Sequence, residues 1–495
     1  MVNTTPQRLR FLLDTNIIIP LQDSMLLLEP SLANFVRLAG AGGHQLLYHP
    51  ASKVDIERDT DTARRDRTLA RLHLYTRLDG TPKSPRNTAQ TSANDACDND
   101  ILYAIECSAV HALVTEDKDI HAKARQGGFG NRVYNIQTAE DWLRRLHEPT
   151  EVHLPNIEDV PMYSLTSQLN ASFFDSLREG YDAPDRSFDK WFQDKAQTGR
   201  KTWVARANSE FIEAICIYAI QTDERINNEN EVLSGRSLKL CTFKVGEQIR
   251  GQKIGELFLK AAFRFATENS CENIFVHTST DQVYLLELLS DFGFFQRGMY
   301  GTDTMLVKTH PIAPPNDDIP ALSYAIQYFP QYRRDATVQK FIVPIKPQYH
   351  LTLFPEIAIQ GQLFSGNSVA GNAIKQAYLC KAKSNLVKPG DIVLFYRTDD
   401  QMAITTLGIV ERYEVHVDPA TIMQIVSRRT VYSYSNIEDM VDTPIKVMLF
   451  RLANHFTLPI PFAALKEQDI VSGPIQSITK ISDESFSRIL SLAKQ

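Results

Sequence analysis

Prolines gather at two places in the chain, and this distribution most constrains how the chain can fold. The first is LHEPTEVHLPNIEDVP, around residues 149–161, and the second is HPIAPPNDDIP, at residues 310–320. Because proline fixes φ and has no backbone N–H, such clusters disfavour helix interiors and central strands. We therefore predict linkers there and three domains, at residues 1–150, 151–312 and 320–495.

The composition is that of an ordinary globular protein. Of the 495 residues, 43% are hydrophobic and 23% are charged, which excludes a disordered, collagenous or coiled-coil chain. The net charge of −6 argues against a generic, histone-like nucleic-acid binder, but local basic patches are compatible with it. The six cysteines include no C-x-x-C pair, which favours a reduced, cytoplasmic setting. We expect no membrane span, because no run of about 18 apolar residues occurs.

Acidic residues recur at the ends of the elements expected in the first segment. The run Phe11–Ile19 predicts a buried parallel strand, and Asp14 lies at its C-terminal end. Further strands are expected at residues 46–50 and 112–115, and helices at 51–59 and 101–110. The acids at these element ends are Asp14, Asp55, Asp59, Asp98, Asp100, Glu116, Asp117 and Asp119.

This order of strands and helices predicts an acidic pocket, because ligand sites in open α/β sheets lie at the carboxyl ends of the strands. Several carboxylates in one pocket repel one another and need a hard divalent cation, such as Mg²⁺ or Mn²⁺, to stay ionised together. Such ions activate water for phosphodiester cleavage. Each acid taken alone is better explained as a helix cap, so the hypothesis depends on the set.

The first segment resembles the PIN-domain ribonucleases, which include toxins of bacterial toxin–antitoxin pairs. The matching stretches are FLLDTNIII, HPASKVDIERD, DNDILYAIE and HALVTEDKDI, within residues 8–145. The resemblance implies a three-layer α/β fold, metal-dependent RNA cleavage and, since PIN domains often pair, a homodimer. It places the catalytic, metal-binding acids at Asp14, Asp55, Asp98 and Asp117, with Asp100 as an alternative third acid and Glu57 or Asp59 as an alternative second one.

A glycine-containing turn between a strand and a helix marks the second segment. The turn Gly246–Gly255 connects a strand expected at residues 238–245 to an amphipathic helix expected at 256–269. Free backbone N–H groups at a helix N-terminus bind anions such as a pyrophosphate, and Arg250 and Lys253 add positive charge. A strand at 273–278 and a helix at 282–290 are expected to follow.

This segment resembles the GNAT-family N-acetyltransferases, which bind acetyl-CoA. The family's motif is Arg or Gln, two residues, Gly, one residue, then Gly or Ala, and Lys253 replaces its first glycine here. The departure weakens cofactor binding only if that position requires a positive φ. The resemblance implies an α+β fold and an acetyl-CoA site formed by Val245, Arg250, Gly251, Gln252, Lys253, Ile254 and Gly255.

The residues that would move protons during acetyl transfer are less clearly marked. Glu213, in a strand expected at residues 211–220, is the candidate general base, and a partly exposed strand carboxylate is the alternative. The family often carries a tyrosine acid four residues before the glycine of its terminal Gly-Phe element. Leu289 occupies that position, and Tyr284 is better explained as a packed aromatic residue. The sequence therefore supports acetyl-CoA binding more directly than acetyl transfer.

The third segment contains short strand-like runs separated by turns, which predicts a small, mostly β barrel. It resembles PUA-like domains of the ASCH and EVE type through VKPGDIVLFY, TTLGIVERYE and a helix expected at GNAIKQAYL. The resemblance implies contacts with RNA, for which the candidates are Lys375, Tyr378, Arg397 and Arg428. Each of these has a solvated or core side chain as its alternative.

Together the segments predict a multidomain protein with an α/β PIN-like domain, an α+β GNAT domain and a mostly β PUA-like barrel. The expected function is a metal-dependent ribonuclease coupled to an acetyltransferase and an RNA-binding module, as in a toxin of a toxin–antitoxin or phage-defence system with an antitoxin partner. One alternative is an acetyltransferase of RNA, tRNA included, or protein, whose PIN domain only binds. A second is a non-catalytic scaffold that acetyl-CoA regulates.

Overall fold

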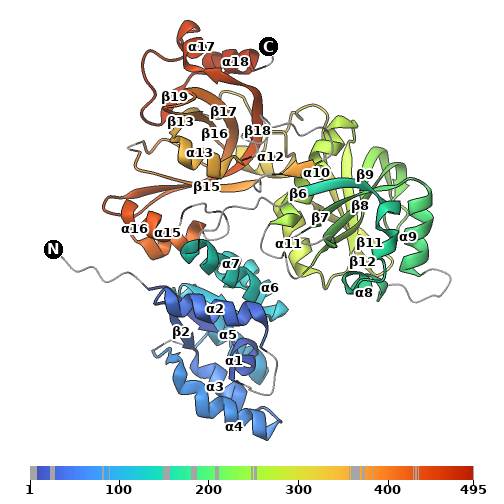
Figure 1. The fold of residues 1–495 in the computed structure, drawn as a ribbon, viewed down its shortest axis with the longest axis vertical. Coiled ribbons are helices and arrows are strands. Elements are labelled where there is room, and N and C mark those ends of the chain that lie inside the picture. Colours follow the sequence, from blue (N-terminus) through green and yellow to red (C-terminus); the bar gives the residue numbers. More distant parts are fainter. Residues whose placement is uncertain are drawn as a thin grey trace. The chain divides into compact units, whose positions relative to one another are not determined.

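The computed structural model describes residues 8–493 except 23–27, 81–82, 89, 149–155, 180–186, 207–210, 247–248, 250–252, 356, 358–367, 371–373, 383, 427–428, 430–431 and 433. The chain forms two compact units (Figure 1). Unit 1 comprises residues 1–152 and 415–445, and unit 2 comprises residues 153–414 and 446–495. None of the described helices combines the length and hydrophobicity that a bilayer crossing requires.

Unit 1 is built on a five-stranded sheet with the order β3-β2-β1-β4-β5, in which every neighbouring pair is parallel. Its central strand is nearly fully buried, as the continuous apolar run predicts. The strands are β1 (Arg10–Leu13), β2 (Gln45–Tyr48), β3 (Thr76–Arg77), β4 (Ala112–Val114) and β5 (Val133–Tyr134).

Helices connect these strands, and two of them differ from the sequence prediction. The predicted strand Phe11–Ile19 ends at Leu13, because the Asp14 carbonyl accepts hydrogen bonds from the N–H groups of Ile17 and Ile18 and starts a helix. Asp98 and Asp100 do not open their helix, which starts at Ala93 after the Ser92 cap. The helices are α1 (Thr15–Gln22), α2 (Pro30–Ala41), α3 (Pro50–Glu57), α4 (Thr62–Arg71), η1 (Leu72–Leu74), α5 (Ala93–Glu106), α6 (Lys118–Gln126), η2 (Gly130–Arg132) and α7 (Ile136–His147).

Unit 1 also contains two helices from far along the chain. Helices α15 (Pro419–Val426) and α16 (Tyr434–Met440) lie between two long strands of the C-terminal region, and α16 packs against α7. The chain therefore passes between the units three times. The predicted domain at residues 320–495 does not anticipate that residues 415–445 belong to unit 1.

The first sheet of unit 2 has eight strands in the order β11-β12-β10-β9-β8-β7-β6-β14. Its only described parallel pair is β9 with β10. The strands are β6 (Asn156–Pro161), β7 (Lys201–Arg206), β8 (Ile212–Arg225), β9 (Val232–Val245), β10 (Asn273–Thr278), β11 (Phe295–Tyr300), β12 (Asp303–Thr309) and β14 (Ser368–Ala370). Residues 156–161, predicted as linker, thus form a strand.

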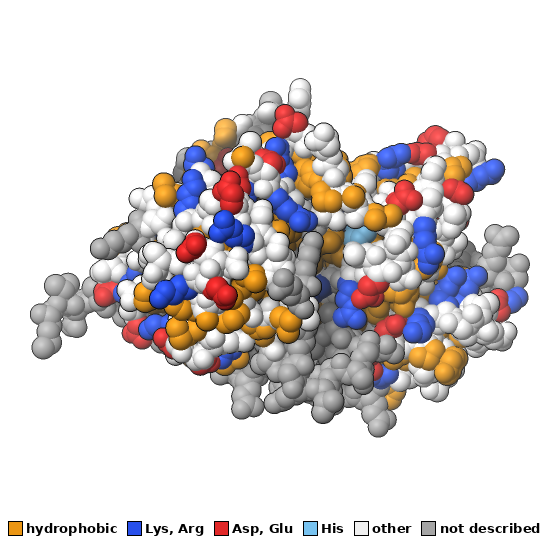
Figure 2. All heavy atoms as spheres, turned by 90° about the horizontal axis from the view of Figure 1, so that it is seen from above, with side chains coloured by type: hydrophobic (Ala, Val, Ile, Leu, Met, Phe, Trp, Pro, Cys, Tyr) orange, Lys and Arg blue, Asp and Glu red, His pale blue; other side chains and the backbone are white. Residues whose placement is uncertain are grey.

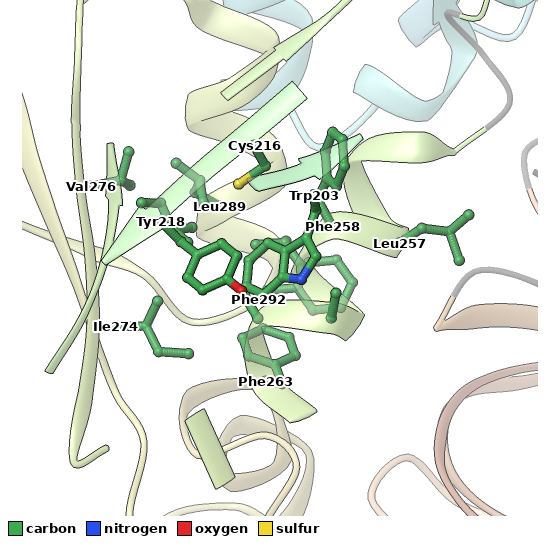
Figure 3. Packing of buried hydrophobic residues seen from close by; sticks show 14 of the residues in the cluster. Trp203, Cys216, Tyr218, Leu257, Phe258, Phe263, Ile274, Val276, Leu289 and Phe292 are labelled. Carbon is green, nitrogen blue, oxygen red and sulfur yellow. The ribbon is translucent and has the colours of Figure 1, made fainter. Parts of the chain in front are cut away.

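Helices α10 (Ile254–Glu268) and α11 (Val283–Asp291) pack on one face of this sheet through a large apolar cluster (Figure 3). Trp203 and Tyr218 stack there with ring centroids 3.9 Å apart, a contact worth about 0.5–1.5 kcal/mol beyond the buried area. The other face is covered by η3 (Met162–Gln168), η4 (Ser172–Phe174) and α9 (Phe188–Gln197), and α8 (Asp175–Arg178) lies between η4 and α9 in the sequence.

The second sheet of unit 2 has the order β15-β18-β17-β16-β13-β19. The predicted helix at GNAIKQAYL is wrong, because the six residues of β15 pair with β18 and are mostly buried, and so short a helix gains little by itself. The elements are α12 (Ala321–Gln327), β13 (Lys340–Ile345), α13 (Pro347–Leu353), β15 (Lys375–Cys380), β16 (Ile392–Arg397), β17 (Ala403–His416), β18 (Ile445–Pro461), α17 (Phe462–Glu467), β19 (Thr479–Ile481) and α18 (Asp483–Leu492).

The turn after α11 packs against the C-terminal end of α12. Gly293 has φ +80°, and a Cβ at this position would lie 2.3 Å from the Ile326 carbonyl oxygen. Gly301 has φ +62° but open space around it. We expect Gly301→Ala to cost about 1–2 kcal/mol of unfolding free energy for its left-handed backbone, and Gly293→Ala at least about 3 kcal/mol. Chemical denaturation tests this pair, and equal losses would contradict the packing described.

Candidate functional site

Strands β9 and β10 part in the middle of the first unit 2 sheet. Their parallel pairing is described over four rows and ends at Leu240 and Val276. From there β9 continues to Val245. Its register with β8 shifts at this same point, because Ile217 faces Thr242 while Tyr218 faces Leu240, which leaves Cys241 as a bulge. A bulge bends its strand, so β9 turns away where its pairing with β10 stops.

The diverging part of β9 is also more exposed than the part that pairs with β10. Leu238 and Leu240 are fully buried, whereas every residue of Cys241–Val245 is partly exposed. Central strands of a covered sheet are normally buried on both faces. The end of β9 therefore provides an accessible edge inside the sheet.

Helix α10 begins next to this edge with an unusual backbone conformation. Lys253 immediately precedes the helix and has φ +59°, in the left-handed region that favours glycine. The position that is a glycine in the GNAT motif thus has a positive φ, and lysine adopts it at a conformational cost of roughly 1 kcal/mol. Gly255 lies close to α11, since a Cβ there would be 2.6 Å from Leu288 Cδ2. Arg250, Gly251 and Gln252 lie outside the described residues.

Strands β15 and β18 of the second sheet hold the start of α10 and the end of α11. Lys253 Nζ donates to the Lys375 carbonyl oxygen at 3.2 Å, and the Lys375 N–H donates to Glu256 Oε2 at 3.2 Å. The Lys375 ammonium forms an ion pair with Asp291 Oδ2 at 2.6 Å. Buried Arg451 donates to the Asp291 carbonyl oxygen at 2.7 Å. Nothing in the sequence signals these contacts, which join residues more than 80 positions apart.

The residues considered for proton transfer lie on two different elements, β8 and α11. Glu213 lies on β8, burial raises the pKa of its carboxyl group, and its carbonyl oxygen accepts the Gly246 N–H at 2.7 Å. It therefore lies at the far end of the exposed β9 edge from the Cys241 bulge. Tyr284 is 44% exposed on α11, and Leu289 is fully buried.

Comparison with known families identifies this region. Residues 162–294 match the model of the acetyltransferase (GNAT) family. The chain contains a GNAT acetyltransferase domain. The matched range includes β9, the Gly246–Gly255 turn, α10, β10 and α11, which are the elements that form the divergence.

Solved structures with similarity to the chain are distant. The ASCH protein of Zymomonas mobilis is 17% identical, with 31% of this chain and 94% of that chain covered and a TM-score of 0.25. NAA60 of Arabidopsis thaliana in complex with acetyl-CoA is 17% identical, with 31% and 99% covered and a TM-score of 0.23. A GNAT-family acetyltransferase of Staphylococcus aureus Mu50 is 14% identical, with 31% and 98% covered and a TM-score of 0.24. Scores this low establish no shared fold. No curated protein matches the chain.

In unit 1, Asp14 lies at the C-terminal end of β1 within a hydrogen-bond network. Its Oδ2 accepts from the Thr115 hydroxyl at 2.6 Å and from Asn16 Nδ2 at 2.8 Å, and its Oδ1 accepts from the Thr15 N–H at 2.7 Å. The Thr15 hydroxyl also donates to Asp55 Oδ2 at 3.0 Å. Burial, above all, raises the pKa of Asp14. The LLDTN and LVTED stretches therefore contribute threonines that the sequence prediction missed.

The four predicted acids lie in one another's electrostatic field. The pKa of Asp98 is raised to about 7, first by burial and then by the charges of Asp14, Asp117 and Asp55. Asp100 is not part of this cluster, since its Oδ1 accepts from the Ser84 N–H at 2.7 Å and from Asn87 Nδ2 at 2.8 Å. These contacts favour Asp98 as the third acid.

Contacts also bear on which residue is the second acid and on whether the acids could hold a metal ion. Asp59 is bound by Arg64, with N–O distances of 2.6 and 2.7 Å, and Asp55 is paired with Arg58 at 3.1 Å. Asp55 also accepts from the Thr15 hydroxyl and lies in the field of Asp14 and Asp98, which favours it as the second acid. Asp117 caps α6 by accepting from the N–H groups of Asp119 and Ile120, as the simpler explanation of a helix cap predicted. Within the part of the chain that the structure describes, no three His, Cys, Asp or Glu side chains are grouped so that they could hold a metal ion.

The candidate nucleic-acid residues do not form an exposed basic surface. Lys375 is bound to Asp291, Tyr378 is 7% exposed with its hydroxyl donating to the Pro344 carbonyl oxygen, and Arg397 pairs with Asp400. Arg428 lies outside the described residues. Figure 2 shows a face on which Lys and Arg side chains are interspersed with Asp and Glu side chains. The predicted roles of Lys375, Tyr378 and Arg397 are therefore not supported by their contacts.

The raised pKa of Asp98 predicts a pH-dependent loss of stability. Because the folded pKa lies above the ordinary value of 3.8, folding favours the protonated acid, and stability is lost as pH rises through the range from 3.8 to about 7. Asp98→Asn should therefore raise the stability of unit 1 at pH 8 by at least about 1 kcal/mol in EDTA, with a smaller gain at pH 4. Thermal unfolding measures this, with exposed Asp66→Asn as the control. An unchanged or lower Tm of Asp98→Asn at pH 8 would contradict the field described.

Proposed function

We propose that the chain is an acetyl-CoA-dependent N-acetyltransferase whose cofactor binds where β9 leaves β10. The observation that carries the proposal is the coincidence of the Cys241 bulge, the end of the β9–β10 pairing and the positive φ of Lys253 within one GNAT domain. Strand divergence admits a ligand into the sheet, and the helix start binds its phosphates.

The residues fit the parts of acetyl-CoA. The pyrophosphate would bind at the start of α10, at the positive end of the helix dipole. The backbone N–H groups that would hold it are those of Lys253, Ile254 and Gly255. The partly exposed end of β9, from Cys241 to Val245, spans about 17 Å of extended strand, beside which the pantetheine chain would lie as an added strand does. The thioester would then reach the point of divergence. When bound, acetyl-CoA supplies an activated acyl group.

The contacts of Lys375 give the C-terminal part of unit 2 a role in this site. The Lys375 N–H holds Glu256 in the first turn of α10, and the Lys375 carbonyl oxygen holds the side chain of Lys253, the residue before that helix. Held in this way, Glu256 is directed toward the Lys375 N–H, which reduces its repulsion of a bound phosphate. The second sheet thus supports cofactor binding.

The acceptor is an amine of RNA or protein in this proposal. Both classes follow from the sequence interpretation, and the ASCH-type resemblance of the third segment favours RNA. A scaffold that binds acetyl-CoA without transferring the acetyl group is the alternative, and thiol release from acetyl-CoA distinguishes it.

A second candidate function is RNA cleavage by unit 1, with Mg²⁺ or Mn²⁺ as the resembling PIN nucleases use. It is favoured by four carboxylates in one another's field, of which Asp14 follows β1 and Asp117 precedes α6. The donor chemistry suits these ions. The arrangement of the acids does not suit these ions, because no three ligating side chains converge among the described residues. Asp14 and Asp117 also accept hydrogen bonds from other groups of the protein. A cytoplasmic toxin-type role, an antitoxin partner and a homodimer stay predictions from the resemblance.

Substitutions of Lys253 test the cofactor site. Lys253→Gly loses the bond to the Lys375 carbonyl oxygen but keeps the N–H, permits the positive φ and leaves the Glu256 bond in place. Acetyl-CoA affinity should therefore stay within about threefold of the wild type. Lys253→Pro removes the N–H and forces φ to about −65°, and should weaken binding at least 100-fold. Isothermal titration with acetyl-CoA measures both variants, and circular dichroism checks their folding. Wild-type affinity in a folded Lys253→Pro protein would contradict the site.

Substitution of the acids tests the second candidate. Wild-type protein, Asp14→Asn and the surface control Asp66→Asn are incubated with single-stranded RNA and Mg²⁺ or Mn²⁺. If unit 1 cleaves RNA, the wild type and the control cut it and Asp14→Asn loses at least 100-fold. Cleavage that persists unchanged in Asp14→Asn, or fails to occur with the wild type, removes the nuclease assignment.

A further inference from the structure

A histidine stands at the point where the two strands part. Val276 is the last residue of β10 that pairs with β9, and His277 follows it. Side chains alternate along a strand, and Ile274 and Val276 pack in the cluster formed with α10. Phe275 belongs to a separate cluster with Ile226 and Met305 on the other face. His277 shares the face of Phe275 and so lies opposite the helices that would hold the cofactor.

An aspartate orients the His277 ring. His277 Nδ1 lies 3.0 Å from Asp303 Oδ2 at the start of β12, and the two side chains are 26% and 34% exposed. When the carboxylate accepts from Nδ1–H, the neutral ring has Nε2 as its hydrogen-bond and proton acceptor. The pair therefore has the geometry of an oriented base.

Other polar groups surround the pair on the same face. The Tyr300 ring lies 5.0 Å from the His277 ring, and the Lys239 ammonium lies 5.8 Å from the Tyr300 ring. Lys239 is in turn paired with Glu224 at 3.1 Å. The residues around His277 thus come from five strands of the sheet, β8 to β12.

We propose that His277, oriented by Asp303, is the general base of acetyl transfer, which places the amine on the face opposite α10 and α11. This inference rests on the proposed function. A neutral amine attacks the thioester carbonyl carbon, and its N–H proton passes to His277 Nε2 as the N–C bond forms. The C–S bond breaks with its electron pair on sulfur. The imidazolium then gives its proton to the thiolate, which yields the amide, CoA thiol and neutral His277.

His277 fits this role better than Glu213. The exposed edge of β9 extends from Cys241 to Val245, and Glu213 lies beyond its end, beside Gly246. A base is useful only within hydrogen-bond reach of the reacting nitrogen. His277 is adjacent to the divergence, where the proposed thioester lies, whereas Glu213 lies beside the phosphate end.

The test uses the full chain, acetyl-CoA and a pool of tRNA and of peptides with free α-amino groups and lysines, and it follows thiol release. His277→Ala should lower kcat 100- to 1,000-fold and leave the KM for acetyl-CoA within threefold. Added imidazole should restore part of this rate, which a purely structural role would not allow. Asp303→Asn should lower kcat at least tenfold. Glu268→Gln, an exposed carboxylate paired with Arg264 on α10, should match the wild type.

The possible failures are distinguishable. Thiol release by His277→Ala within threefold of the wild type overturns the role of His277 alone. A loss that imidazole does not restore, accompanied by a raised KM for acetyl-CoA, also overturns it and makes the residue structural. If the wild type binds acetyl-CoA in calorimetry but releases no thiol with the pool, acetyl transfer fails together with its base. If the wild type does not bind acetyl-CoA, the cofactor site itself fails.

Discussion

The departure of β9 from β10 at the Cys241 bulge is the feature on which the rest of the acetyltransferase domain depends. Four paired rows hold the strands together, and beyond them one extra residue in β9 bends the strand away. Beyond this irregularity the end of β9 is partly exposed in the middle of a covered sheet. The irregularity also places His277 at the point of divergence and brings the end of β9 to the turn that starts α10.

The surroundings of this divergence are stabilised from outside the GNAT match. Phe329 and Ile374 complete the apolar core of the domain, and Lys375 and Arg451 bind the ends of α10 and α11. Arg451 is 2% exposed and pairs with Glu411 at 2.6 Å. Removing one member of such a buried pair costs about 3–5 kcal/mol. Contacts thus join the GNAT match to the C-terminal part of unit 2, and the division of this unit into two domains stays a prediction.

Much of the fold could be predicted from the sequence, because local patterns decided it. The apolar runs of β1, β4, β9 and β10 and the amphipathic pattern of α10 predict elements that the structure contains. The prediction failed where tertiary contacts decide. Residues 375–380 form the strand β15 because they pair with β18. No local sequence pattern indicates that α15 and α16 belong to unit 1.

The candidate sites show the same division. The motif predicted a helix start that the structure has at α10, and the acids of unit 1 were predicted from their places near the ends of expected elements. The conformation of Lys253, the role of Lys375 and the His277–Asp303 pair could not be predicted, since each depends on backbone geometry or on a partner far along the chain. The field of the other acids favours Asp98 over Asp100 as the third acid.

Hydrogen–deuterium exchange with and without acetyl-CoA tests the central claim most directly. If the cofactor binds along the diverging end of β9, exchange should slow in peptides that cover residues 241–256 and in β15, while α5 and α6 of unit 1 stay unchanged. Protection confined to other parts of the chain, or no protection at saturating acetyl-CoA, would contradict the proposed site.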